Sequence, residues 1–254
     1  LHRVDRRQRQ MCIRDRSIRE SVAAANEEWV HWGGNTIDLR EGAKNKPFDV
    51  STTDKDAARI QYILEKYCPA ANSKTTAKDI RDDRYAWSGV TISYFMKKGG
   101  FQRWQEATGL GFPFSAGHRK WIKLAVRATK GGAAPRFMFH AFPIEHEQAM
   151  PKVGDLVAYA RPDDLTKAEK SAGKKAREPS FEEAKSWFMR LDDDDDYLSH
   201  SDLVVHVAAD DRFLEVIGGN VGQSVTKKII PLDERGRIAD RTKPWFAVLR
   251  NDGS

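Results

Sequence analysis

The chain has 254 residues, of which 40% are apolar and 31% charged, and its formal net charge is +6. Its mean hydropathy is −0.65, and no apolar run approaches the roughly 18 residues that a membrane span needs. These properties exclude a spanning helix and indicate a globular protein with one large hydrophobic core or two small ones.

The first 16 residues, LHRVDRRQRQMCIRDR, differ from the rest of the chain. They hold six arginines and two aspartates without apolar periodicity, and the string MCIRDR resembles the translated sequencing adapter found at the edges of metagenomic genes. We interpret residues 1–16 as non-native or disordered and exclude them from fold reasoning; a basic arm for nucleic acid or membrane is the alternative. Without them the charge falls to about +2 and Cys68 is the one remaining cysteine.

Apolar residues in the first half of the chain recur at helical spacing. They predict four helices: 17–32, 51–68, from Trp87 or Ser88 to Gly99-Gly100, and 116–129. Serine and threonine at 51–53 offer N-caps for the second helix, and glycine pairs or proline follow each helix.

From residue 154 onward the apolar period changes from helical to alternating. This predicts five short strands: 154–161, 201–209, 213–220, 224–232 and 244–250. The joints ADDR and VGQ are short, which indicates antiparallel hairpins. A polar insertion, 162–199, holds one predicted helix, SFEEAKSWFMRL, and ends in DDDDD, which we interpret as a solvated loop rather than a calcium site. Helices followed by an antiparallel sheet predict a single α+β domain over residues 17–254.

Ser88 is the first candidate for chemistry because it opens a predicted buried helix. A side chain in the first helical turn lies among unpaired backbone N–H groups and at the positive end of the helix dipole. Both favour a developing anion, and the same N–H groups can form an oxyanion hole. The alternative is that Ser88 is an ordinary N-cap, which the local sequence favours.

Polar residues on the predicted strands can complete a site. His200 opens a strand and shares a face with Asp202, so His200 is a candidate general base that Asp202 orients. Asn220 ends the next strand, where the hairpin brings it near His200 and an amide can fix the imidazole tautomer; simple turn chemistry is the alternative. His118, at the start of the fourth helix, is interpreted as structural.

Metal binding is disfavoured. His200, Asp202 and His206 are suitable ligand types, but they extend over too long a stretch of strand for one ion. We predict no metal and no cofactor.

The order of the candidates is nucleophile on a helix start, histidine on a strand start, then amide on the next strand, which is the order of papain-like folds. The segment YAWSGVTISYFMKKGGF resembles the nucleophile helix of CHAP and NlpC-type cell-wall hydrolases, in which a cysteine holds the position of Ser88. GDLVAYAR is similar to their first strand, SHSDLVVHV to the strand that begins with the catalytic histidine, and EVIGGNVGQSV to a segment that contributes a polar residue.

The chain more closely resembles the bacterial domain-of-unknown-function family 2272. The shared motifs are AANEEW, Trp-Ser at the helix, FPFSAGH, HSDLVV, GGNV and PWFAVLR, over about residues 21 to 250. Together the resemblances imply a papain-like α+β fold, with N-terminal helices packed on a roughly five-stranded antiparallel sheet.

These resemblances imply a hydrolase of amide bonds, of amidase or endopeptidase type, acting on peptidoglycan or a related peptide. Ser88 would be the nucleophile, His200 the base, and Asn220 or Asp202 the orienting group. Because serine is a poorer nucleophile than cysteine, the alternative is a non-catalytic module that binds cell-wall peptide or glycan. A nucleic-acid binder is disfavoured, since little charge remains without residues 1–16. The sequence predicts neither compartment nor oligomeric state.

Overall fold

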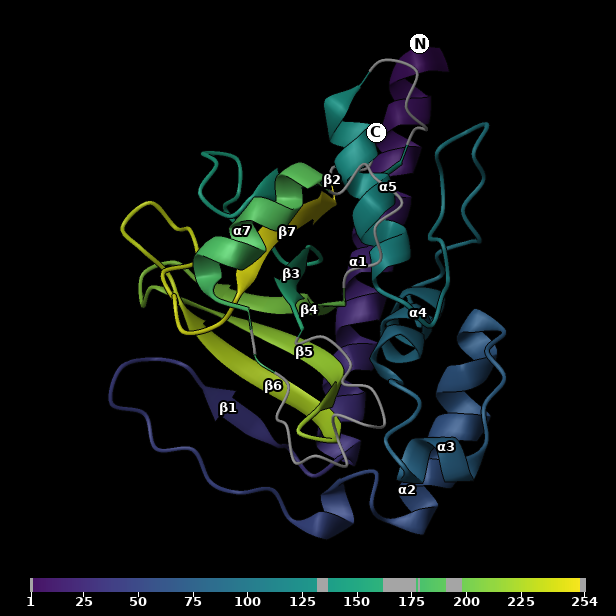
Figure 1. The fold of residues 1–254 in the computed structure, drawn as a ribbon. Coiled ribbons are helices and arrows are strands. Elements are labelled where there is room, and N and C mark those ends of the chain that lie inside the picture. The colour runs from purple at the N-terminus through teal and green to yellow at the C-terminus, as the bar shows by residue number, and fades with distance from the viewer. Residues whose placement is uncertain (1, 132–136, 162–176, 178, 191–197, 252–254) are drawn as a thin grey trace.

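The computed structural model describes residues 2–131, 137–161, 177, 179–190 and 198–251. Its helices are α1 (His2–His31), α2 (Ala57–Tyr62), α3 (Ala77–Arg81), α4 (Ser88–Lys98), α5 (Arg119–Lys130) and α7 (Phe181–Arg190) (Figure 1). Its strands are β1 (Thr36–Asp38), β2 (Phe139–Pro143), β3 (Leu156–Ala160), β4 (Ser199–Ala208), β5 (Phe213–Val221), β6 (Ser224–Pro231) and β7 (Trp245–Asn251).

The strands form one seven-stranded mixed sheet in the order β1-β6-β5-β4-β3-β7-β2. The five predicted strands are β3 to β7, and their mutual pairings are antiparallel. The prediction of a roughly five-stranded antiparallel sheet was nevertheless wrong, because β2 is added at one edge and β1 pairs with β6 in parallel at the other. The chain is thus an α+β protein.

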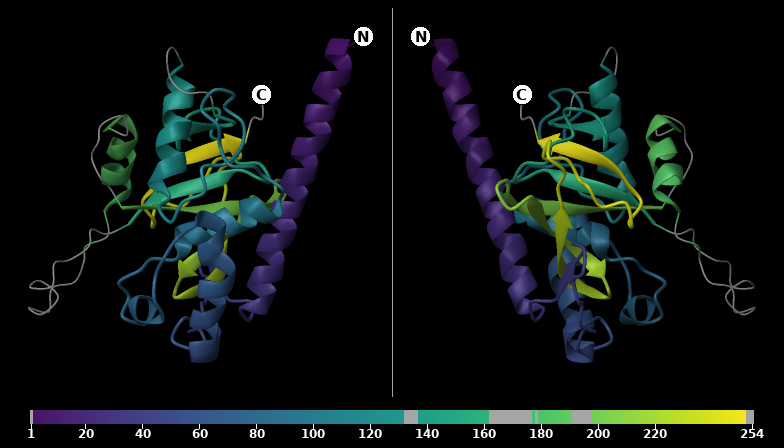
Figure 2. Two further views of the ribbon diagram at one scale, coloured as in Figure 1. Left: turned by 90° about the vertical axis from the view of Figure 1, so that its right-hand side faces the viewer. Right: turned by 90° about the vertical axis from the view of Figure 1, so that its left-hand side faces the viewer.

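The sheet separates two hydrophobic cores. The larger core holds buried side chains of α1, α4 and α5, together with Leu203 and Val205 of β4. The smaller core holds Val204 of β4 and the loop residues Ile144 and Ile238. Side chains of a strand alternate between its two faces. The helices α1, α4 and α5 therefore cover one face (Figures 1 and 2), and loops together with Phe181 of α7 cover the other.

The helix boundaries follow the predicted signals with two differences. Helix α1 ends before Gly33 as predicted, but it begins at His2, and its first turns extend beyond the sheet in Figure 2. Helix α2 is capped by Asp56 rather than by residues 51–53, and it continues into a π-helical turn, Ile63–Tyr67, and a 3-10 turn, Cys68–Ala71. The predicted aspartate run 192–196 lies outside the described residues. No helix of the described chain is both long and apolar enough to span a bilayer.

Close backbone contacts hold α4 in place. A Cβ at Gly89 would lie 2.0 Å from the Ala116 carbonyl oxygen, and one at Gly219 of β5 would lie 2.3 Å from the Thr91 hydroxyl of α4. Ser93 Oγ donates to Ser115 O at 2.9 Å and accepts from Ser115 N–H at 3.0 Å. These contacts bind the segment that precedes α5 to the side of α4.

We predict that Gly89→Ala destabilises the protein by about 1–3 kcal/mol, because the added methyl group overlaps a backbone oxygen that cannot rotate away. Without this contact alanine would stabilise the helix by about 1 kcal/mol relative to glycine. The sign of the change in the free energy of unfolding therefore tests the contact. Urea unfolding measures it. Gly117→Ala is the matched control, since its nearest atom would be 3.9 Å away; a stabilising Gly89→Ala would contradict the packing.

Candidate active site

Ser88 is the first residue of α4, and its side chain is 2% exposed. The N-cap residue is Trp87, and no side-chain capping hydrogen bond forms within the described chain, so the interpretation of Ser88 as an N-cap was wrong. Ser88 Oγ instead lies 2.8 Å from Nε2 of His118, the residue before α5. The structure therefore gives the serine a histidine partner other than the predicted His200.

The protonation of His118 follows from its second ring nitrogen. The backbone N–H of Ser201 donates to His118 Nδ1 at 3.0 Å, and Ser201 Oγ lies 2.9 Å from the same atom. A backbone amide can only donate, so Nδ1 carries no proton and a neutral ring carries its proton on Nε2. His118 therefore donates its hydrogen bond to Ser88 Oγ, and in this state it cannot accept the serine proton.

His200 leaves β4 on the opposite face from Ser88. Alternation along the strand places His200 and Asp202 with Val204, which faces the smaller core, whereas α4 belongs to the larger one. This is the physical reason that His200 forms no hydrogen bond with Ser88 in the described structure. The His118 ring contacts both residues, since its centroid lies 4.5 Å from that of His200.

A chain of buried polar contacts orients His200. Its Nε2 lies 3.2 Å from Asp202 Oδ1, and Asp202 Oδ2 accepts from Lys228 Nζ at 2.6 Å. Lys228 Nζ also lies 2.9 Å from the hydroxyl of Tyr159, whose ring contacts His200 at a centroid distance of 4.9 Å. A Cβ at Gly218 would lie 1.7 Å from Asp202 Oδ1, so glycine leaves the space that this carboxylate occupies.

The two histidines therefore present different atoms to the site. Asp202 is ion-paired and accepts a hydrogen bond, so the proton of His200 lies on Nε2 and its Nδ1 holds a lone pair. This Nδ1 is buried and has no hydrogen-bond partner among the described residues. His118 thus donates toward Ser88, while His200 keeps the unpaired basic nitrogen.

Burial sets the charge state of the cluster. Burial lowers the pKa of His118 well below its usual value, and the positive charges of Arg161 and Lys228 lower it further. Burial likewise lowers the pKa of His200, with contributions from His118, Arg161 and Lys228. Burial raises the pKa of Asp202 and lowers the pKa of Lys228, while their mutual attraction opposes both shifts. Both imidazoles are therefore neutral near pH 7.

Asn220 lies at a shift in the pairing of β5 with β6. The pairing of β5 with β6 shifts register between Gly218 and Val221, and Asn220 adopts a left-handed backbone with φ of 55°. Its side chain makes no hydrogen bond to His200 in the described part of the chain. Its backbone oxygen accepts from Arg161 NH2 at 3.1 Å instead. Of the two predicted orienting groups, the structure places Asp202 against His200.

Sequence reasoning missed His118 and Lys228. His118 was assigned a structural role, although FPFSAGH belongs to the motifs of the resembled family. Lys228 follows Lys227 in a strand, and neighbouring strand residues point to opposite faces. In a sheet covered on both faces both lysines are therefore buried, as they are here. The pair of adjacent lysines in a predicted strand could therefore have indicated a buried lysine.

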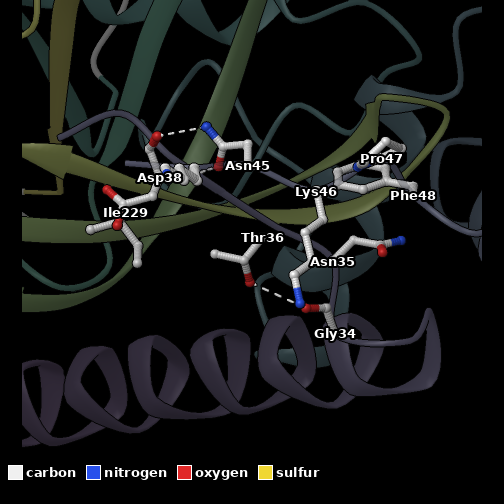
Figure 3. Close-up of a pocket in the computed structure, with 10 residues that line it drawn as sticks. Gly34, Asn35, Thr36, Asp38, Asn45, Lys46, Pro47, Phe48 and Ile229 are labelled. Carbon is white, nitrogen blue, oxygen red and sulfur yellow. Dashed lines mark hydrogen bonds between the residues drawn. The ribbon is translucent and has the colours of Figure 1, made fainter. Parts of the chain in front are cut away.

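Ser88, His118 and His200 do not line the pocket drawn in Figure 3. This pocket, of about 370 Å³, lies at the edge strand β1 and includes Lys44, Lys46 and Phe48. The Asn45 side chain pairs with the Asp38 backbone through bonds of 2.7 and 2.9 Å and so covers the strand edge. Within the described residues, no group of three or more His, Cys, Asp and Glu side chains is arranged to hold a metal ion.

The chain belongs to the bacterial family described as "Uncharacterized protein conserved in bacteria (DUF2272)", whose model matches residues 56–251. This match confirms the resemblance to that family. Comparison with curated proteins and with solved structures gives no match. The resemblance to CHAP and NlpC-type hydrolases remains a prediction.

We predict that the protein loses stability as the pH falls below about 6.5, the pKa of an unperturbed histidine. The folded-state pKa values of His118 and His200 are lowered, so the unfolded chain binds protons that the folded chain does not. The slope is roughly 1.4 kcal/mol per pH unit for each such proton. Urea unfolding between pH 7.5 and 5.5 measures it.

In that experiment His118→Gln reduces the slope, whereas His206→Gln, at an exposed position of β4, leaves it unchanged. Equal slopes for the wild type and His118→Gln would mean that His118 is not held neutral by burial.

Proposed function

We propose that the chain is an amide-bond hydrolase with Ser88 as its nucleophile. The observation that carries the proposal is the buried Nδ1 of His200, which has no hydrogen-bond partner among the described residues, in a cluster whose other histidine hydrogen-bonds to Ser88. An unsatisfied buried polar atom costs about 1–3 kcal/mol, and a functional role accounts for such a cost. A lone pair on a carboxylate-oriented imidazole is what a general base requires.

The reaction would start with transfer of the Ser88 hydroxyl proton to His200 Nδ1 as Ser88 Oγ attacks the carbonyl carbon. Asp202, held by Lys228, would stabilise the imidazolium that forms. Backbone N–H groups at the start of α4 and the Nε2–H of His118 would donate to the developing oxyanion. His200 would then protonate the leaving amine, and water would hydrolyse the acyl-serine with His200 again as base.

This sequence requires a rearrangement on substrate binding. Ser88 and His118 are 2% and 3% exposed, and His118 Nε2 occupies the hydrogen-bonding position on Ser88 Oγ. The His118 ring contacts both Ser88 and His200. The substrate therefore has to displace this ring from Ser88 Oγ. Because His200 leaves β4 on the other face from Ser88, its imidazole also has to turn toward Ser88 before the serine proton can reach it.

The resemblance to cell-wall hydrolases suggests peptidoglycan peptides as the first substrates to examine. Purified sacculi and chromogenic N-acyl amides would be incubated with the wild type and with variants that remove each group. His206→Gln is the matched control, because this histidine is exposed on the same strand as His200.

We predict that Ser88→Ala lowers kcat/KM by at least about 1,000-fold, because the nucleophile is lost. His200→Gln causes a loss of similar size, and the double variant is no slower than either single variant, since the two groups act as a unit. His118→Gln has a smaller effect because it removes only a donor. Turnover that survives Ser88→Ala would overturn the proposal, and a loss with His118→Gln but not with His200→Gln would reassign the base.

A non-catalytic binding module is the second candidate. It is favoured by the direction of the His118–Ser88 hydrogen bond and by the burial of both side chains. On this account the protein would bind sacculi without releasing soluble products, and Ser88→Ala would leave that binding intact. Release of products by the wild type but not by Ser88→Ala excludes it.

A further inference from the structure

Arg161 lies beside the cluster that surrounds His200. It directly follows β3, and its backbone N–H donates to Leu198 O at 2.8 Å, which continues the pairing with β4. In that pairing Tyr159 lies opposite His200. Residues two apart in a strand share a face, so Arg161 is on the same face as Tyr159 and His200.

The guanidinium is held in place from β5, which lies beyond β4 in the sheet. Arg161 NH2 donates to the backbone oxygen of Asn220 at 3.1 Å, and Asn220 presents this oxygen from a left-handed conformation. The side chain is half-buried. Within the described part of the chain, this contact uses one of the five N–H groups of the guanidinium.

The positive charge of Arg161 has no ion-pair partner among the described residues. Lys228 is paired with Asp202, but no carboxylate lies within ion-pair distance of Arg161 in the described structure. The field of Arg161 reaches the cluster, where it lowers the pKa of His118 and of His200. Among the described residues, the charged groups that act on this cluster are the Asp202–Lys228 pair, Arg161, and Lys243, which acts on Lys228, so positive charge is in excess.

A half-buried cation without a counter-charge is costly unless a ligand supplies one. Guanidinium groups bind carboxylates through two parallel hydrogen bonds. A carboxylate is also the anion that commonly accompanies amide bonds, as at the end of a peptide. Arg161 is therefore suited to hold a substrate carboxylate near the bond to be cleaved.

We propose that Arg161 binds a carboxylate of the substrate, so that the protein acts on amides that carry a free carboxylate. This inference rests on the proposed hydrolase function and specifies its substrate class.

The test compares N-acetyl-dialanine, in L and D forms, with the corresponding carboxamides. The first arm measures binding to Ser88→Ala protein by calorimetry, which does not depend on turnover. We expect the carboxylate form to bind about 10-fold to 100-fold more tightly than the carboxamide, because hydrogen bonds to charged groups are strong. Arg161→Gln removes this preference, and Arg161→Lys, which keeps the charge but not the paired geometry, restores part of it.

Arg212→Gln is the matched control. Arg212 is exposed in the hairpin at the other end of β4 and lies 3.6 Å from Glu234. Its loss leaves the preference unchanged, and urea unfolding shows that each variant is folded. Equal binding of the carboxylate and carboxamide forms by the parent, or a preference that survives Arg161→Gln, would overturn the proposal.

The second arm measures kcat/KM for the same compounds with Ser88 present. Carboxylate binding through Arg161 without any hydrolysis would contradict the hydrolase function while supporting carboxylate recognition. Hydrolysis that is equally fast for both forms would contradict carboxylate recognition while supporting the hydrolase.

Discussion

The arrangement of the site depends on one hydrogen bond, from the backbone N–H of Ser201 to Nδ1 of His118. The pairing of β4 with β5 begins only at Leu203, and the Ser201 amide donates to His118 instead of to a neighbouring strand. Because this donor has no alternative role, the neutral His118 ring has to place its proton on Nε2. Ser88 therefore receives a hydrogen bond, and the basic nitrogen of the cluster is on His200.

Other contacts stabilise the buried carboxylate of Asp202, which orients His200. Burying a carboxylate is costly unless it is paired, and Lys228 supplies the pair for Asp202 at 2.6 Å. Gly218 supplies the space, since any side chain there would meet the carboxylate. With Asp202 fixed, His200 is oriented through Nε2, and its Nδ1 remains without a partner in the described chain.

The spacing of apolar residues predicted the helices and strands that are long enough to show a regular pattern. Helix α4 begins at Ser88 as expected, and the five alternating segments are β3 to β7. Strand β1 has three residues and β2 ends in Pro143, so neither presents a clear alternating pattern. Ser88, His200 and Asp202 were recognisable because their positions follow from helix starts and strand alternation.

The contact between Ser88 and His118 was not predictable in the same way. It joins residues 30 positions apart, one on α4 and one directly before α5. It depends on how the segment before α5 packs against Gly89 and Ser93 of α4. The predicted hydrogen bond of Asn220 to His200 does not form in the described structure, where a register shift after Gly218 interrupts simple hairpin pairing. Strand alternation placed His200, Asp202 and Val204 on one face of β4. It could not show that α4 covers the opposite face.

The protonation states of the two histidine rings test the account most directly. Long-range ¹H–¹⁵N spectra of histidine-labelled protein at pH 7, assigned with His118→Gln and His200→Gln, distinguish protonated from unprotonated ring nitrogens. We predict that both rings are neutral, with the proton on Nε2 and a bare Nδ1. A proton on Nδ1 of His118 would contradict the account, because the bond from Ser201 could not then exist and the basic nitrogen would face Ser88.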